Sequence, residues 1–293
     1  MEDEIIARAE QVGLRVRMHA RAIDGTGSFG IGADEPVVTA SVLKVPLAVE
    51  LADQAEREHC DLAEQITVPA GPKVPSPYGL ATFRHPVTLS LDALATLMIG
   101  ISDNVATDLV FAKIGKPAVR ALLDRLGLAG TVIEQDCAEL LGTIGEDLGY
   151  DYTDDERALT ELTPEQLRGL RALDPAQTCR STAAEMTALL GMIWRDEAAG
   201  PGACADVRRW LGLQVWPHRL RSGFHTDEVR ISGKTGTLPT IRNEVGVVEY
   251  ADGGRFAVAV FTEAVDARSQ APERDAFIGF AAARAIEVVR SQA

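Results

Sequence analysis

The chain has 293 residues, 46% of them hydrophobic and 25% charged, which suits one large domain or two interleaved ones and argues against a disordered chain. Its net charge of −14 would repel phosphate backbones and anionic lipids, so nucleic acids and membrane surfaces are poor partners. Only five of the 29 basic residues are lysines, so a lysine inside a motif is less easily a coincidence here.

The N-terminal part predicts a helix, a hairpin and a second helix. Apolar residues at helical spacing over 4–12 end near Gly13. Alternation over 16–23 then predicts a strand, and the Asp-Gly pair that follows it is a strong turn signal. A second hairpin strand is expected within 29–38, and residues 39–58 carry a helical pattern.

The middle of the chain is nearly all helical in its pattern, apart from a short strand at 66–68. Four stretches have helical spacing: 89–99, 106–126, 181–197 and 206–213. Between the second and third of these, residues 145–166 contain eight acidic side chains and one arginine. We expect an exposed acidic loop there, with a short helix near 164–172.

The last ninety residues return to strands. Alternating or continuous apolar runs predict three of them, at 229–232, 244–250 and 256–263, and a closing helix follows at 274–290. Strands at both ends of the chain predict an α/β (α+β) fold, with an antiparallel sheet built from both termini, flanking helices and an inserted all-helical domain. We place the sheet domain at 1–50 and 205–293, and the helical domain at 51–204 with an enlarged acidic loop at about 141–180.

The N-terminus and the cysteines bear on the compartment. The opening residues, Met-Glu-Asp-Glu-Ile-Ile-Ala-Arg, lack the cationic start and apolar stretch of a signal peptide. No apolar run approaches the ~18 residues of a membrane helix. The cysteines show neither a CxxC pair nor metal-ligand spacing; they are Cys60, Cys137, Cys179 and Cys204. We expect reduced thiols in a cytoplasmic protein, with a secreted mature form as second choice.

Three short motifs bring together the groups that an activated serine needs. Ser-Val-Leu-Lys at 41–44 begins a predicted helix, so its hydroxyl and amine share one helix face near the positive N-terminus. A serine hydroxyl is a weak nucleophile until a neighbour takes its proton. Ser-Asp-Asn at 102–104 falls between two predicted helices, and Lys-Thr-Gly at 234–236 lies among the C-terminal strands.

The order, spacing and context of these motifs resemble those of class A β-lactamases, within the wider group of penicillin-recognising serine enzymes. The resemblance extends from the first hairpin to the last helix. Ser-Asp-Asn, in place of the Tyr-x-Asn of carboxypeptidases, favours class A. The family implies a β-lactamase/transpeptidase-like fold and a serine acyl-enzyme that needs neither a metal nor an organic cofactor.

The resemblance also implies catalytic roles. Ser41 would attack a cyclic amide and become acylated, and Lys44 would assist its deprotonation. Ser102 would relay a proton to the leaving nitrogen, and Lys234 would hold the electrostatic field at Ser102.

Substrate binding would fall on a second set of residues: Asn104, Thr235, Gly236, Thr237, Arg221 and Arg242. By the resemblance, Asn104 would bind the acyl side chain and Thr235 a carboxylate. Backbone N–H groups of Ser41 and Thr237 would form the oxyanion hole. Either Arg221 or Arg242 would support the carboxylate pocket. Among the histidines, His218 could line the site, whereas the three tryptophans are expected in the core or at its rim.

One family feature is missing. Class A enzymes carry a Glu-x-x-Leu-Asn stretch whose Glu activates the deacylating water, and the best match here is Cys-Ala-Glu-Leu-Leu at 137–141. Glu134 and Glu139 are candidate deacylation bases, although both lie out of register. The interval from Ser102 to Lys234 is also longer than in the family, which we assign to the acidic segment. Unless one of these glutamates or an acid from the 145–166 insertion supplies the base, we expect slow deacylation.

Three functions stay open. The first is a serine hydrolase that opens a β-lactam or a similar small amide, with a carboxylate-bearing small molecule as its substrate. The second is an acyltransferase or esterase that acts on another small-molecule amide or ester. The third is a non-enzymatic sensor domain that is acylated and stays so.

Overall fold

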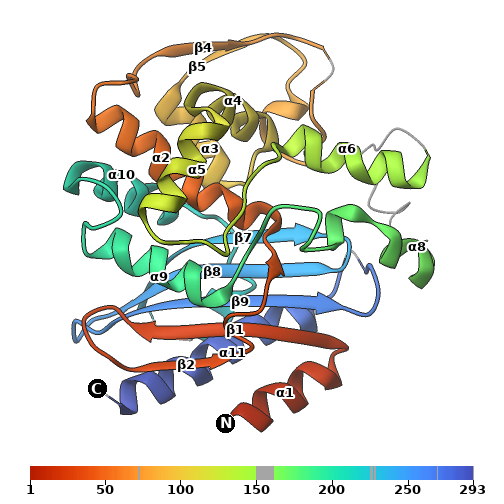
Figure 1. The fold of residues 1–293 in the computed structure, drawn as a ribbon, viewed down its shortest axis with the longest axis vertical. Helices are drawn as coiled ribbons and strands as arrows, with labels where there is room; N and C mark the ends of the chain where they lie inside the picture. The colour runs from red at the N-terminus through yellow and green to blue at the C-terminus, as the bar shows by residue number, and fades with distance from the viewer. Residues whose placement is uncertain (72, 150–161, 225–226, 228, 269, 293) are drawn as a thin grey trace.

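The fold is built around one five-stranded antiparallel sheet (Figure 1), seen in a computed structural model that describes residues 1–71, 73–149, 162–224, 227, 229–268 and 270–292. The strand order is β2-β1-β9-β8-β7. The strands are β1 (Leu14–Ala22), β2 (Ser28–Ile31), β7 (Val229–Leu238), β8 (Ile241–Tyr250) and β9 (Arg255–Ala264). Two come from the N-terminal part and three from the C-terminal part, which confirms the predicted sheet.

Helices cover both faces of this sheet. On one face, α1 (Glu2–Gln11) and α11 (Pro272–Ser291) pack through an apolar core that includes Ile5 and Phe277. On the other, α9 (Ala183–Trp194) packs against β1, β8 and β9. Strands β8 and β9 are therefore buried over most of their length, as expected for strands covered on both sides.

A helical layer lies beyond α9, and it is centred on one buried helix. Its helices are α2 (Lys44–Glu56), α3 (Leu91–Gly100), α4 (Asn104–Ile114), α5 (Lys116–Arg125), α6 (Cys137–Leu148), α8 (Pro164–Gly169) and α10 (Pro201–Leu211). Helix α2 contacts α3, α4, α5 and α10, and it is buried from its first residue to Asp53. Although α9 falls within 51–204, it packs on the sheet, and the division of the chain into two domains stays a prediction.

Short elements connect these layers. They are the 3-10 turns η1 (Ala40–Leu43), η2 (Gly79–Thr82), η3 (Arg171–Leu173) and η4 (Leu220–Gly223), and the paired short strands β3 (Val37–Val38) with β6 (Arg180–Ser181) and β4 (Gln65–Val68) with β5 (Val87–Ser90). The turn η1 joins β3 to α2 and packs against β7 and β8. This contact brings the first motif to the edge strand of the sheet.

Two helical predictions need correction. Residues 106–126 form two helices, not one, because Gly115 adopts a φ of 83° between them and Pro117 lies in the first turn of the second. Helix α6 was not predicted at all, although Asp136 and Glu139 form a capping box at its start. Of the acidic segment 145–166, residues 150–161 lie outside the described residues.

Other features concern membranes and thiols. Within the described residues, no helix combines the length and the apolar character needed to cross a membrane. All four cysteines are unpaired, and three of them are buried. The buried thiols pack within the core, where they act as small apolar side chains.

Candidate active site

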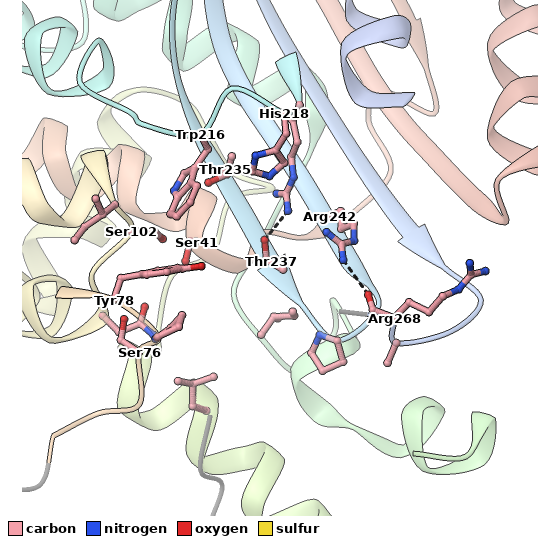
Figure 2. A pocket seen from close by; sticks show the side chains of 18 residues that line it. Ser41, Ser76, Tyr78, Ser102, Trp216, His218, Thr235, Thr237, Arg242 and Arg268 are labelled. Atoms are coloured by element: carbon pink, nitrogen blue, oxygen red, sulfur yellow. Dashed lines mark hydrogen bonds between the residues drawn. The ribbon is translucent and has the colours of Figure 1, made fainter. Parts of the chain in front are cut away.

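A cavity of about 290 Å³ lies between the helical layer and the edge strand β7 (Figure 2). It is lined by six of the residues singled out from the sequence: Ser41, Ser102, Asn104, Thr235, Thr237 and Arg242. The three motifs are far apart in the chain, and the fold brings them to one cavity. His218 also lines it, as the sequence suggested.

The backbone is strained on both sides of this cavity. Ala40, directly before Ser41, has a φ of 46°, and Ser102 has a φ of 63°. Left-handed conformations are costly for residues other than glycine, so the surrounding structure must hold them in place. Asn243 does this for the turn η1, because its side chain donates to the carbonyl oxygens of Val38 (2.9 Å) and Thr39 (3.3 Å).

Lys44 joins two of the motifs directly. Its Nζ donates to the Ser102 carbonyl oxygen (2.8 Å), to Ser102 Oγ (3.1 Å) and to Asn104 Oδ1 (2.8 Å). The side chain is fully buried, and this burial lowers the pKa of Lys44. The lowered pKa means that Lys44 loses its proton more easily than an exposed lysine does.

The third motif is held by close packing of β7 against η1. A side chain on Gly236 would come within 2.7 Å of the Thr39 carbonyl oxygen, so only glycine permits this approach. Lys234 is fully buried and donates to the Thr235 carbonyl oxygen at 2.8 Å. Burial, together with the neighbouring cations Lys44 and Arg219, keeps the pKa of Lys234 well below its usual range.

The arginines are arranged differently from the prediction. Arg221 donates to the Val229 carbonyl oxygen (2.6 Å) and borders a different cavity, so the structure places it away from the site. Arg219, two residues earlier, is buried and donates to Thr237 Oγ1 (2.8 Å) and to the Gly236 carbonyl oxygen (3.0 Å). Arg242 lines the cavity as predicted.

The carboxylate of Asp275 connects Arg219 and Arg242. Arg219 Nε lies 2.8 Å from Asp275 Oδ1, and Arg242 Nη1 lies 3.1 Å from both Asp275 oxygens. A buried guanidinium that is bonded this way is fixed in position and needs no further rearrangement to meet an anion.

The two glutamates proposed as deacylation bases point into solvent. Glu134 pairs with Arg120 at 3.8 Å, and its side chain is 72% exposed. Glu139 pairs with Lys116 at 2.5 Å and belongs to the capping box of α6. Neither glutamate lines the cavity. The structure therefore brings neither of them to the three motifs.

Cys137 occupies the start of α6, next to the buried lysine. Burial raises the pKa of its thiol to about 12, and its neighbour Lys44 partly opposes the shift. Asp108 accepts hydrogen bonds from the backbone N–H groups of Cys137 (2.7 Å) and Ala138 (3.1 Å), so its carboxylate is engaged at the helix N-terminus. Burial raises the pKa of Asp108 to about 6.

A second network lies beneath β7 and was not foreseen. Glu244 is 1% exposed, and its carboxylate accepts hydrogen bonds from Gln214 Nε2 (2.5 Å) and from the Leu220 backbone N–H (2.7 Å). Gln214 Oε1 in turn accepts the Thr235 N–H at 2.6 Å. Glu244 thus ties the segment before η4 to the edge strand. Burial raises the pKa of Glu244 to about 7.

Sequence signals for the missed residues were uneven. The capping box of α6 was readable in the sequence, and it would have shown that Cys137 begins a helix. Arg219 could not be separated from Arg221 by spacing, because both lie just before the Lys-Thr-Gly strand. Asp108 and Glu244 carry no local signal, since their roles depend on contacts with distant backbone.

Comparisons with known proteins identify the family of the chain. A model described as "Beta-lactamase enzyme family" matches residues 1–289. "Beta-lactamase regulatory protein BlaB" of Streptomyces cacaoi is 32% identical over 296 residues, which cover 92% of this chain and 94% of that protein.

Solved structures share the fold. The β-lactamase of Sphaerobacter thermophilus DSM 20745 superposes with a TM-score of 0.77 at 22% identity, covering 99% of this chain and 96% of that one. A mutant of PBP-A, in an acyl-enzyme complex with penicillin G, superposes with a TM-score of 0.75 at 19% identity and covers 98% and 96%. The predicted β-lactamase/transpeptidase-like fold is confirmed. Because the family model spans nearly the whole sequence, this chain belongs to the β-lactamase enzyme family.

Proposed function

We propose that the protein is a serine acyl-enzyme hydrolase that opens a β-lactam or a similar small amide through Ser41 and releases the product slowly. The observation that carries the proposal is the buried Lys44, hydrogen-bonded to Ser102 and Asn104 beside the cavity that Ser41 lines. Membership of the β-lactamase enzyme family and the fold shared with a penicillin-acylated protein support it.

The acylation step follows from these groups. Lys44, whose pKa burial lowers, takes the proton of Ser41 while Oγ attacks the amide carbon. The backbone N–H groups of Ser41 and Thr237 stabilise the oxyanion. As the C–N bond breaks, Ser102 passes a proton to the leaving nitrogen and is reprotonated through Lys44. The product is a Ser41 ester and a free amine.

Substrate binding uses the polar side of the cavity. Thr235 and Thr237 offer hydroxyl donors, and the guanidinium of Arg242 lines the same cavity. Together with the buried charge of Lys234, these groups favour a carboxylate on the substrate. Asn104 binds the amide of the acyl side chain. Gly236 contributes by letting β7 approach η1 closely.

Among the described residues, no carboxylate side chain lines the cavity to activate water, and the acids within 151–161 lie outside the described part of the chain. Cys137 is a neutral thiol at physiological pH, since burial raises its pKa to about 12, and a thiol accepts a proton poorly. Asp108 is engaged with two backbone N–H groups at the start of α6. General-base assistance typically contributes 10²- to 10⁴-fold, so without it the acyl-enzyme should accumulate.

Intact-protein mass spectrometry tests the proposal. The wild type is mixed with benzylpenicillin, and the mass is followed from seconds to hours. We expect an adduct of one benzylpenicillin that forms quickly and decays slowly, and that is absent from Ser41→Ala. An adduct that peptide mapping assigns to another residue, or no adduct with any penicillin or cephalosporin, would contradict the proposal.

A second candidate is an acylated sensor that never turns over. The name of the Streptomyces relative, a β-lactamase regulatory protein, favours it. The same time course separates the two functions. A sensor keeps its full adduct for many hours, whereas a slow hydrolase returns to the unmodified mass and releases ring-opened penicillin.

A third candidate is an acyltransferase or esterase, because slow hydrolysis of the Ser41 ester leaves time for the acyl group to pass to another acceptor. Adding small amines or alcohols to the acylated protein tests it. Faster loss of the adduct, with the acylated amine or alcohol as product, would favour transfer over hydrolysis.

A further inference from the structure

The free edge of β7 presents backbone groups to the cavity. Thr235 and Thr237 both lie on this strand and line the cavity (Figure 2). The Thr235 N–H donates to a side chain, Gln214 Oε1, at 2.6 Å, and so points away from β8. N–H groups two residues apart on a strand point to the same side, so the Thr237 N–H points to the same free edge. The bond at Thr235 therefore fixes the strand two residues before the N–H that the proposed mechanism places in the oxyanion hole.

Gln214 is itself oriented by the buried carboxylate of Glu244. Its Nε2 donates to Glu244 Oε1 at 2.5 Å, while the other carboxylate oxygen accepts the Leu220 N–H at 2.7 Å. An amide side chain has a donor end and an acceptor end, so the end that meets the Thr235 N–H depends on what Glu244 offers. An ionised carboxylate offers acceptors only. It therefore directs the nitrogen of Gln214 toward itself and the oxygen toward β7.

A neutral side chain at position 244 cannot serve both of these partners. If Glu244 binds a proton, or if glutamine replaces it, one of its two ends becomes a donor. That end then faces the Leu220 N–H or Gln214 Nε2, which are both donors. The Leu220 N–H is fixed in the backbone, whereas the Gln214 amide can turn. Because a turned amide presents its nitrogen to the Thr235 N–H, the bond to the edge strand is lost.

Two cations act on Glu244 from the elements packed around it. Lys234 lies on β7 and Arg219 directly precedes η4, and both favour the ionised carboxylate. Burial opposes them more strongly and raises the pKa of Glu244 to about 7. The folded protein therefore holds both forms of Glu244 near neutral pH. The orientation of Gln214 can change over the same pH range.

We propose that Glu244 is a positioning residue for acylation: its ionised carboxylate orients Gln214, and Gln214 holds the Thr235 N–H and with it the free edge of β7. The inference rests on the proposed function, because the reaction that is positioned is the acylation of Ser41. Protonation of Glu244 removes a buried charge and so stabilises the fold, yet it releases Gln214 from β7. Stability and the acylation rate should therefore respond to this proton in opposite directions.

The test compares acylation by benzylpenicillin in the wild type and in Glu244→Gln, measured by rapid-quench mass spectrometry from pH 5 to pH 8. At pH 8 the variant should acylate about 10-fold more slowly, since a small misplacement near the reacting atoms can cost up to about 10²-fold. At pH 5 the two rates should agree within about twofold, because the wild type is then protonated at Glu244. Taking the ratio cancels pH effects that both proteins share, such as the titration of Lys44.

Two further variants test the route and the specificity. Glu249→Gln neutralises a carboxylate farther along β8 and should acylate like the wild type at every pH. Gln214→Met should slow acylation about as much as Glu244→Gln at pH 8, and the double variant should be slower by less than about a further twofold. The positioning role is overturned if the rate ratio is within twofold of one at pH 8, does not change with pH, or multiplies fully in the double variant. If Glu244→Gln does not fold, Gln214→Met must show the same pH-dependent ratio to the wild type.

A measurement without chemistry separates this inference from the proposed function. In Ser41→Ala made with ¹⁵N-labelled threonine, the Thr235 amide resonance is assigned by its loss in Thr235→Ser. It should shift between pH 8 and pH 5, and the shift should vanish when Glu244→Gln is added. If no β-lactam acylates the wild type but this shift is present, the proposed function fails and the control of β7 by Glu244 stands. Acylation that does not depend on Glu244 supports the proposed function and overturns the positioning role.

Discussion

The two sides of the cavity differ in the buried polar groups that they offer for catalysis. On one side, Lys44 and Lys234 are fully buried, and Lys44 makes three hydrogen bonds to the Ser-Asp-Asn segment. On the other, the start of α6 offers the neutral thiol of Cys137 and a carboxylate, Asp108, already bonded to backbone. Burying two cations is expensive, and it is tolerated where the charge or its loss has a use.

The contrast teaches that forming an ester and hydrolysing it are separable demands. In the proposed mechanism Lys44 takes the proton of Ser41 during acylation, whereas attack by water needs a base on the other face of the ester. Under the proposed function, acylation is kept and ester hydrolysis is slowed without a change of fold, because Cys137 packs as a small apolar residue at the start of α6.

The largest effect should come from the buried lysine beside Ser102. Lys44→Met keeps the side-chain volume but removes the proton acceptor and three hydrogen bonds. We expect the acylation rate constant to fall by about 10³-fold, within the range of general-base contributions. Rapid-quench mass spectrometry measures it. Lys113→Met, at an exposed lysine paired with Glu64, is the control and should react like the wild type. A loss below threefold would remove Lys44 from the mechanism.

The next largest effect should come from replacing Lys234, the buried lysine of the edge strand β7. Lys234→Met should lower kcat/KM for acylation by about 10²-fold, which is typical of losing one preorganised electrostatic group. The loss should be smaller for a substrate whose carboxylate is esterified, because the cation then has less to attract. Equal losses for the acid and its ester would show that Lys234 does not act on the substrate charge.

The side of the cavity at the start of α6 can be tested by introducing an acid at Cys137. Cys137→Glu should speed adduct decay by roughly 10-fold or more, which is below the usual 10²- to 10⁴-fold of general-base catalysis because Asp108 beside it repels a second carboxylate. Combining it with Asp108→Asn removes that repulsion and should raise the rate further. Cys137→Gln is the control for size. If Cys137→Gln accelerates decay as much as Cys137→Glu, base catalysis is not the cause.

The smallest effect is a pH dependence of stability. Burial raises the pKa of Glu244 from 4.5 to about 7, so between these pH values the folded state holds a proton that the unfolded state has lost. Stability from this group therefore falls as pH rises from about 4.5 to 7. Relative to Glu244→Gln, the wild type should gain a few degrees in Tm when pH falls from 8 to 5. Glu249→Gln, on the same strand, keeps Glu244 and should follow the wild type at both pH values.

Much of the fold was predictable because its signals are local. Alternation in β1, the continuous apolar run of β9, helical spacing in α9 and α11, and strands at both ends of the chain all follow from short-range sequence pattern. The failures were local as well. Gly115 and the capping box of α6 are also local signals, and they could have predicted the break within 106–126 and the start of α6.

The candidate site divides in the same way. The motifs around Ser41, Ser102 and Lys234 are contiguous residues with a fixed chemistry, so the sequence alone determined them and, through them, the family. Only the tertiary structure decided that Arg219 lies at the cavity and Arg221 does not, and that Glu134 and Glu139 face solvent.

The tertiary structure also decided which buried groups titrate abnormally and which rings meet. Glu244 is surrounded by Gln214 and Leu220, and Trp216 contacts Tyr78, a residue 138 positions earlier in the chain. The physical reason is that burial and contact are properties of packing between distant segments. Local pattern specifies a helix or a strand, but a desolvated charge or a ring pair exists only when the segments are assembled.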